Sequence, residues 1–400
     1  MSIEAAPPRP IPIHDPDWWT GNVWADLKWL RTHDPVHRVS TPAGDVWAIS
    51  RHADVMDISR HPLDWPSGRG VLIDDLRRVV AGNESIIYLD PPDHARHRKL
   101  VSGWFKPSVV RAFEERVRAL AVSLLDDVPS GETFDANEAL AIPLPIRVIA
   151  EMLGVPSADQ DKFRLWSDEV IMEGSSQEVE GSEFAPGVLA LYEYFEQHLA
   201  ERRVTPGHDV LSTLVAAELD GHQLSDFEML AFCMTLLVAG NETTRNLLGN
   251  GLEVLAGNPD EWDRLRAEPE LIPLAVEELL RWVTPVLHFA RTAAHDSEIA
   301  GVPIASGEMV VLLYASANRD EAVFGPTADH LDLGRDPNPH VAFGFGEHFC
   351  LGAQLARLEA RVFLEELAAR AATLEVTGPV ERRRSNLMRG LSALPMRFGR

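Results

Sequence analysis

Cysteine is scarce in this sequence, which contains only Cys233 and Cys350 among its 400 residues. Two cysteines are too few for a disulfide framework. No apolar run approaches the roughly 18 residues of a membrane span, and residues 1–19 lack the basic and apolar regions of a secretory signal. Basic residues are outnumbered by acidic ones, 37 against 61, and the net charge of −24 disfavours nucleic acid as a partner. We therefore expect a soluble, cytoplasmic monomer that is not bound to a membrane.

The composition that remains is that of a globular protein. Hydrophobic residues make up 45% of the chain, enough for a large core, and no linker is visible, so we predict one domain over residues 1–400. Alternating residues predict a hairpin at 37–50 and further strands at 298–315, which together complete a small sheet. The β-rich parts are expected at about 35–50 and 296–315.

Most of the chain is predicted to be helical. Proline and glycine signals separate four helices, which we expect at residues 109–125, 144–153, 158–171 and 188–203. Residues 65–88 contain three glycines and predict a long irregular loop, a kind of segment that often covers a binding site. The predicted fold class is mainly α with small β-sheets (α+β).

Residues 343–352 place Cys350 in a glycine-rich turn directly before an amphipathic helix that begins near Ala353. Glycine has no Cβ, so such a turn is tight and approaches a flat object closely. The N–H groups and macrodipole of a helix N-terminus favour the thiolate, which is the form of cysteine that binds metals. The alternative is a structural cysteine, because free cysteine is often a small core hydrophobe.

The pattern Phe343, Gly346, Cys350 and Gly352 resembles the haem-binding loop of the cytochrome P-450 family, of the soluble, actinobacterial type. The resemblance implies a cytochrome P-450 fold, with haem b between a long central helix and the helix that follows the cysteine. Cys350 would be the axial ligand of the haem iron, and Phe343, Gly344 and Gly352 would contact the cofactor. Thiolate ligation favours O–O cleavage. A zinc site would require three or four nitrogen or sulfur ligands, and no supporting cluster is visible.

A long central helix is predicted from Ser225 onward. Ser225 and Glu228 form a capping box, and no breaker follows until Gly257, so the helix spans about 31 residues, or ~46 Å. Near its middle the small residues Ala239 and Gly240 leave room for a flat object. The Thr243 hydroxyl is placed to bond the carbonyl of Ala239, which would kink the helix. The alternative reason for a mid-helix glycine is packing against a neighbour.

The segment from Ala239 to Thr244 resembles the oxygen-activating motif of the same family. The resemblance implies that Ala239 and Gly240 contact the haem. It also implies that Thr243 and Glu242 are catalytic, with Thr243 bonding the oxygen substrate or its water and Glu242 relaying protons from solvent. Leu236 and Val238, which precede the motif, are candidate pocket residues.

Glu278 and Arg281 lie three apart on one predicted helix and are placed to pair. Such pairs are common on surfaces and then contribute little. The resemblance implies a different setting, in which this pair is buried and joined by Arg335. We interpret the three residues as structural.

His94 and Arg98 lie four apart and share one helical face, which a solvated basic face would also explain. The resemblance matches both residues, together with Arg291 and His348, to positions that hold the haem propionates. It also places Val286, Leu287 and His288 along the open face of the haem as pocket residues. For His288 a hydrogen-bonded histidine in a turn is the alternative.

Two further segments are implied to border the substrate. The turn at residues 390–395 would bring Leu391 into the pocket, and residues 173–187 would cap its mouth. Residues 173–187 are rich in glycine, serine and glutamate, so a disordered surface loop is the alternative there.

The resemblance implies a haem monooxygenase that inserts one oxygen atom of O2 into a C–H bond of a hydrophobic molecule. A steroid, a branched lipid or a terpenoid is expected. Electrons from NAD(P)H would arrive through a ferredoxin and its reductase, because no flavin or iron–sulfur domain is visible. The docking patch is predicted at Arg96, Arg98, Lys99, Arg357 and Arg361. Peroxide-driven or rearrangement chemistry and a non-catalytic haem sensor are the alternatives.

Overall fold

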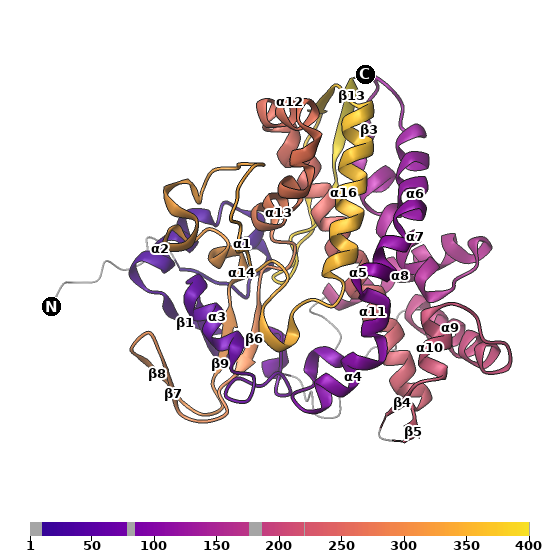
Figure 1. Ribbon diagram of the computed structural model, residues 1–400. Coiled ribbons are helices and arrows are strands. Elements are labelled where there is room, and N and C mark those ends of the chain that lie inside the picture. The colour runs from indigo at the N-terminus through magenta and orange to yellow at the C-terminus, as the bar shows by residue number, and fades with distance from the viewer. Residues whose placement is uncertain (1–9, 78–84, 176–185, 220, 400) are drawn as a thin grey trace.

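The computed structural model describes residues 10–77, 85–175, 186–219 and 221–399. Helices dominate it, and its strands form small separate sheets. Figure 1 shows β1, β6 and β9 on one side of the molecule and helices α6 to α10 on the other. This arrangement confirms the predicted fold class, mainly α with small sheets.

The helices and strands follow one another in a mixed order along the chain. The helices are α1 (Pro16–Thr20), α2 (Trp24–His33), α3 (His52–Arg60), α4 (Asp93–Val101), α5 (Pro107–Ala112), α6 (Glu114–Asp126), α7 (Pro143–Leu153), α8 (Gln160–Ser175), α9 (Pro186–Val204), α10 (Val210–Val215), α11 (Asp226–Ala256), α12 (Pro259–Ala267), α13 (Ile272–Val283), α14 (Tyr314–Ala317), α15 (Glu321–Phe324) and α16 (Ala353–Arg370). The strands are β1 (Val36–Thr41), β2 (Gly44–Ile49), β3 (Phe134–Asp135), β4 (Glu218–Leu219), β5 (His222–Gln223), β6 (Phe289–Thr292), β7 (Ser297–Ile299), β8 (Val302–Ile304), β9 (Met309–Leu312), β10 (Thr373–Val376), β11 (Glu381–Arg382), β12 (Leu391–Ala393) and β13 (Pro395–Gly399).

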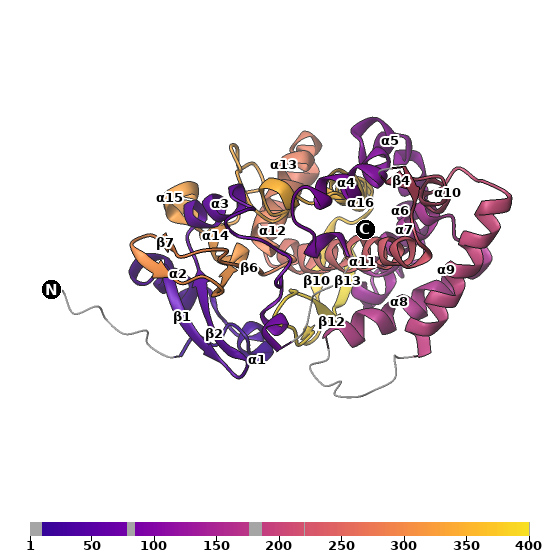
Figure 2. The same ribbon diagram turned by 90° about the horizontal axis from the view of Figure 1, so that it is seen from below.

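The central helix α11 is the element around which the others pack. It has the predicted capping box, in which Ser225 accepts from the Glu228 backbone N–H and the Glu228 carboxylate accepts from the Ser225 N–H. It continues for 31 residues to Ala256, as predicted. It packs against α7, α13 and α16, and Figure 2 shows it running through the middle of the molecule.

The main sheet has the strand order β1-β2-β9-β6. The predicted hairpin is confirmed, since β1 and β2 pair from Val36 with Ile49 to Thr41 with Gly44. Strand β9 runs parallel to β2, and β6 runs antiparallel to β9. The prediction for residues 298–315 was half right, because β7 and β8 pair with each other in a sheet of their own. Strand β6 was not predicted, since its three consecutive buried residues show no alternation.

Three of the four predicted helices match α7, α8 and α9. The helix predicted at residues 109–125 is instead split into α5 and α6 at Phe113. The Phe113 N–H bonds the Val110 carbonyl, only three residues back, which tightens the turn and interrupts the α-helical ladder. In the loop predicted at 65–88, short 3₁₀ turns lie at Ile73–Arg77 and Ile86–Tyr88. Residues 78–84, and residues 176–185 of the predicted pocket cap, lie outside the described residues.

A buried ion triad ties the segment before the cysteine loop to α13. Arg281 donates to both oxygens of Glu278, at 2.8 and 2.7 Å, and Arg335 donates to the same carboxylate at 3.1 Å. Glu278 and Arg281 are completely buried. The structure thus brings together the three residues that were predicted to be structural.

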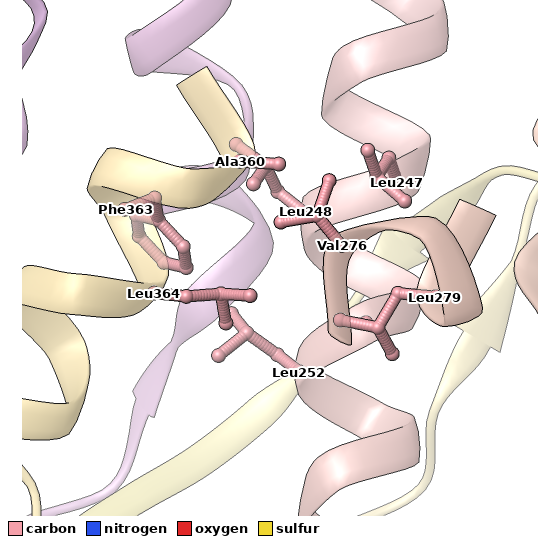
Figure 3. Close-up of a pocket in the computed structure, with 9 residues that line it drawn as sticks. Leu247, Leu248, Leu252, Val276, Leu279, Ala360, Phe363 and Leu364 are labelled. Carbon is pink, nitrogen blue, oxygen red and sulfur yellow. The ribbon is translucent and has the colours of Figure 1, made fainter. Parts of the chain in front are cut away.

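Among the described residues, α11, α13 and α16 enclose a dry cavity of about 10 Å³. Figure 3 shows its lining of aliphatic and aromatic side chains, with Leu247, Leu248 and Leu252 from α11, Val276 and Leu279 from α13, and Ala360, Phe363 and Leu364 from α16. Its walls are apolar and it is barely large enough for one water molecule, so it is expected to stay empty. Gly251 completes the lining on α11.

We predict that Gly251→Ala stabilises the protein. A Cβ at this position would lie 3.6 Å from Leu279 Cδ1, which is ordinary van der Waals contact. The gain in helix propensity is about 1 kcal/mol. The midpoint of urea denaturation should therefore rise. Gly249→Ala is the matched control, because a Cβ there would lie 3.3 Å from Asn137 Oδ1 and is crowded. Equal stabilisation by both substitutions would show that the cavity has no part in the effect.

Candidate active site

The loop before α16 folds tightly around its glycines. Gly344 and Gly346 have φ values of 67° and 74°, in the left-handed region that favours glycine. A Cβ on Gly346 would collide with the Ser59 carbonyl of α3. The Cys350 N–H donates to the Phe343 carbonyl at 2.9 Å, which closes the loop. These contacts hold the Cys350 side chain at the N-terminal end of α16.

The Cys350 sulfur lies in a mixed environment. Desolvation raises the pKa of its thiol, while the N–H groups of Gly352 and Ala353 and the charges of Arg98 and Arg357 act in the opposite direction. The N–H groups at the start of α16 favour the thiolate, as predicted, while burial favours the thiol. A positively charged partner is needed to hold this sulfur as a thiolate.

Four basic side chains from three parts of the chain gather beside the cysteine loop. They are His94 and Arg98 of α4, Arg291 of β6 and His348 of the loop itself. The rings of His94 and His348 lie 4.2 Å apart between centroids. His94 Nδ1 donates to Glu347 at 2.9 Å, and Ser67 Oγ lies 3.1 Å from His348 Nε2. The structure thus brings together all four residues that were predicted to bind the propionates.

The charges in this basic cluster are poorly compensated. Burial lowers the pKa of Arg291 and of Arg98. Burial, together with the charges of Arg291, His94 and Arg98, lowers the pKa of His348 to about 2, so this imidazole is neutral at physiological pH. Buried guanidinium groups require anionic partners. The cluster is therefore suited to bind carboxylates.

Glu347 and Ser67 were not identified from the sequence. Glu347 orients His94 from within the glycine loop, and Ser67 contacts His348 from the irregular loop before α4. The position of Glu347, next to His348, was a usable signal. No signal in the sequence pointed to Ser67, because its partner His348 is 281 residues away in the chain.

On α11, one small residue is uncovered. Ala239 is exposed, whereas Leu237 and Asn241, two residues away on either side, are buried. The Thr243 hydroxyl donates to the Ala239 carbonyl at 2.7 Å, as predicted. A Cβ on Gly240 would lie 3.2 Å from Ile149 Cδ1 of α7, so packing against α7 accounts for this glycine. The contact of Gly240 with haem stays a prediction.

The predicted pocket residues fall into two groups. Leu236, Val238 and Val286 are half-buried, like the segment around Ala239. In contrast, Leu287, His288 and Leu391 are almost completely buried.

The three buried residues, Leu287, His288 and Leu391, pack inside the protein. Leu287 belongs to an apolar cluster with Ile11 and Ile13, and Leu391 packs in the main core. Burial lowers the pKa of His288 to about 4, and its ring lies 6.1 Å from that of Trp19, so it is a neutral core imidazole.

The predicted basic patch is largely neutralised. Arg357 makes a bidentate pair with Glu277, at 2.6 and 2.8 Å, and Arg361 pairs with Glu114 and Glu365, both at 2.7 Å. Arg96 pairs with Asp93 of its own helix, and Arg98 is half-buried near Cys350. Lys99 is exposed and makes no ion pair within the described residues.

These features together fit haem. Cys350 offers one axial sulfur, the basic cluster offers partners for two carboxylates, and Ala239 offers a flat surface without side-chain bulk. The described residues contain no group of three or more His, Cys, Asp or Glu side chains that would hold a metal ion by themselves. Any metal that Cys350 binds would therefore have to bring further ligands of its own. No helix within the described ranges is long and apolar enough to cross a membrane.

Comparisons with known proteins agree with this geometry. The family model for cytochrome P-450 matches residues 189–370. The chain is 39% identical to the vitamin D(3) 25-hydroxylase of Pseudonocardia autotrophica, over 96% of each protein. It is 36% identical to the linalool 8-monooxygenase of Pseudomonas putida, over 96% of this chain and 97% of that protein. It is also 36% identical to a steroid C26-monooxygenase of Mycobacterium tuberculosis, over 96% of this chain and 97% of that protein.

Solved structures show the same fold. A Mycobacterium marinum cytochrome P-450 in complex with pseudoionone superposes with a TM-score of 0.87 at 35% identity, covering 98% of this chain and 99% of that one. A Bacillus megaterium cytochrome P-450 in complex with testosterone gives a TM-score of 0.83 at 34% identity, covering 94% and 99%. The chain belongs to the cytochrome P-450 family of haem-thiolate monooxygenases.

Proposed function

We propose that this enzyme inserts one oxygen atom of O2 into a C–H bond of a steroid or terpenoid. The observation that carries the proposal is the pairing of Cys350, before α16, with the uncovered Ala239 and the bonded Thr243 on α11. Haem bound between these surfaces supplies the oxygen chemistry. The protein supplies the ligand, the orientation, the protons and an apolar cavity.

Each site residue has a distinct task in this proposal. Cys350 holds the iron, and His94, Arg98, Arg291 and His348 orient the cofactor by binding its carboxylates. Neutral His348 donates a hydrogen bond without adding a charge.

The proton path runs through α11. The Thr243 hydroxyl already donates to the Ala239 carbonyl, so its oxygen is free to accept a further hydrogen bond from a water or a reacting group. Glu242, buried one residue earlier, would pass protons to that water.

The substrate class rests on the aliphatic residues that were predicted to line the pocket and on the relatives. Leu236 and Val238 precede Ala239 on α11, Val286 follows α13, and all three are half-buried. Such a surface selects hydrophobic molecules by burial and orients them only weakly. The similar proteins bear names that refer to vitamin D(3), linalool and steroids, and all of these are apolar ring or isoprenoid compounds.

Electrons would come from NAD(P)H through a ferredoxin and its reductase. Because Arg357 and Arg361 are neutralised, the free positive charge on the α4 side is reduced to Lys99 and half-buried Arg98. Docking would therefore depend more on shape and on exposed Phe349 beside Cys350 than on a broad basic patch. We place the enzyme in the cytoplasm as a monomer, in keeping with its two free cysteines.

Cys350→Ala tests the cofactor assignment. Without the sulfur ligand, the reduced carbon monoxide complex should lose the red-shifted absorbance band of a thiolate-bound haem. Cys233→Ala is the matched control, because Cys233 is buried in the core of α11 and should leave the band intact. Persistence of the band in Cys350→Ala would refute Cys350 as the haem ligand.

Thr243→Ala tests the proton path. The variant should keep haem and bind substrate, yet convert a much smaller fraction of the consumed NAD(P)H into hydroxylated product, because proton delivery loses its positioned hydroxyl. Thr244→Ala is the control, since Thr244 is buried on another face of α11. Product formation that remains fully coupled in Thr243→Ala would contradict the assignment.

The substrate class is tested by titrating the enzyme with steroids, terpenoids, fatty acids and small aromatic compounds. Binding beside the iron is read from the spin-state change in haem absorbance. We expect responses to steroids or terpenoids, and weaker responses to the same compounds in Val286→Asp, because the carboxylate would place a charge on the apolar wall. A response to fatty acids alone would overturn the proposed class.

A further inference from the structure

The Glu242 carboxylate has a cationic neighbour from the far end of the chain. Arg383 Nη1 lies 3.8 Å from Glu242 Oε1. The exposed fraction is 14% for the Arg383 side chain and 8% for that of Glu242. Two opposite charges held this close with little solvent between them interact strongly.

The backbone around Arg383 is held firmly against α11. The Arg383 N–H donates to the Gly390 carbonyl at 3.0 Å, which pairs the two sides of the C-terminal hairpin that contains β11 and β12. Gly390 packs on the helix, since a Cβ there would lie 3.1 Å from Asn246 Oδ1 and 3.4 Å from Arg383 Cβ. The hairpin therefore has little freedom to move Arg383 away from Glu242.

Neighbouring contacts fix the register of this hairpin along α11. Arg382 donates to Glu253 at 2.7 Å, and Asn250 donates to the Arg389 carbonyl at 2.9 Å. Residues 242, 246, 250 and 253 follow helical spacing and form one polar stripe that the hairpin covers. Arg383 meets the end of this stripe that is nearest Thr243.

The Arg383 and Glu242 side chains lie close together without a direct hydrogen bond between them. A separation of 3.8 Å is too long for a direct hydrogen bond. Arg383 Nη1 and Asn246 Nδ2 are buried and have no hydrogen-bond partner among the described residues. Buried donors of this kind are normally satisfied by ordered water.

We propose that Arg383 is a positioning residue for proton delivery, which holds Glu242 as a carboxylate and orients it through a bridging water. The inference rests on the proposed relay role of Glu242. A guanidinium does not release its proton, so Arg383 is not itself an acid in the relay. Glu242 accepts a proton from solvent, passes it to the water at Thr243 and returns to the carboxylate that Arg383 stabilises.

Among the described residues, charged groups on two elements lie near Glu242. Arg383 faces it from the hairpin, and Arg245 follows three residues later on α11. Removal of Arg383 takes away one positive charge beside the carboxylate. The protonation of Glu242 should then shift, although the helix itself is unchanged.

Infrared spectroscopy of the resting holoenzyme tests the proposal without turnover. The carbonyl band of protonated Glu242 is assigned by its loss in Glu242→Gln and followed against pH. In Arg383→Gln and Arg383→Met the midpoint of this titration should rise by about 1–3 pH units, the usual effect of removing an opposite charge at this distance. Arg383→Lys should restore most of the wild-type midpoint.

Arg382→Gln is the matched control. It breaks an ion pair between the same hairpin and the same helix, at Glu253, and should lower stability without moving the Glu242 midpoint. In turnover, Arg383→Gln should raise the solvent deuterium isotope effect on product formation, whereas Arg382→Gln should not. A merely structural role for Arg383 predicts the same behaviour for both variants.

The possible outcomes separate the positioning role of Arg383 from the relay role of Glu242. If Glu242→Gln changes coupling and the isotope effect but both Arg383 variants leave the infrared midpoint unchanged, the positioning role is wrong and the relay stands. If Glu242→Gln leaves coupling and the isotope effect unchanged, the relay itself is wrong. A raised midpoint in both Arg383 variants, together with recovery in Arg383→Lys, supports the inference.

Discussion

The buried carboxylate of Glu278 is the interaction on which the cofactor side of the molecule depends. It accepts hydrogen bonds from Arg281 and Arg335, from the Asp332 backbone N–H at 3.0 Å and from the Asn338 amide at 3.0 Å. Removing one partner from such a buried ion pair typically costs about 3–5 kcal/mol, because a charge is left without compensation. The segment that leads into the cysteine loop is thereby fixed to α13.

Arg281 extends this constraint to the β-rich side. Its guanidinium also donates to the carbonyls of Asn318 and Ala328, at 2.8 Å each, in the chain after β9. The Asn318 side chain in turn accepts from the Val341 N–H at 2.7 Å, just before Phe343. The main sheet, α13 and the cysteine loop are therefore connected by one hydrogen-bonded network. The network supplies more bonds than stability alone requires, which is expected where a ligand must be held in one place.

Features that depend on neighbouring residues in the chain could be predicted from the sequence, and features that depend on distant residues could not. The capping box at Ser225 and the glycine turn at Cys350 are local patterns, so the sequence predicted both α11 and the loop. The break at Phe113 and the pairing of β7 with β8 depend on weak local preferences and were missed. The packing of Gly240 against Ile149 could not be predicted, because a glycine shows that space is limited but not which group limits it.

The candidate site also contains residues that a local motif predicts and residues that no local motif predicts. The residues that a known motif contains, from His94 to His348, converge as expected. Leu287, His288 and Leu391 were predicted to line the pocket from their position in the chain. They are almost completely buried, and their contact with substrate stays a prediction. Side-chain direction in an irregular segment depends on the local backbone path and has no periodic signal. Arg383 had no signal either, since it is 141 residues from Glu242 and lies among three successive arginines.

Local charge, rather than the net charge of −24, decides what this protein binds. On the outer surface of α16, glutamates neutralise Arg357 and Arg361, so those guanidinium groups serve to join helices. Beside Cys350, Arg291 is buried and Arg98 is half-buried, and burial lowers the pKa of both. Their positive charge is therefore available to the anionic groups of a cofactor. Arg319 and Arg389, which are also buried with a lowered pKa, instead lie over the Trp24 ring.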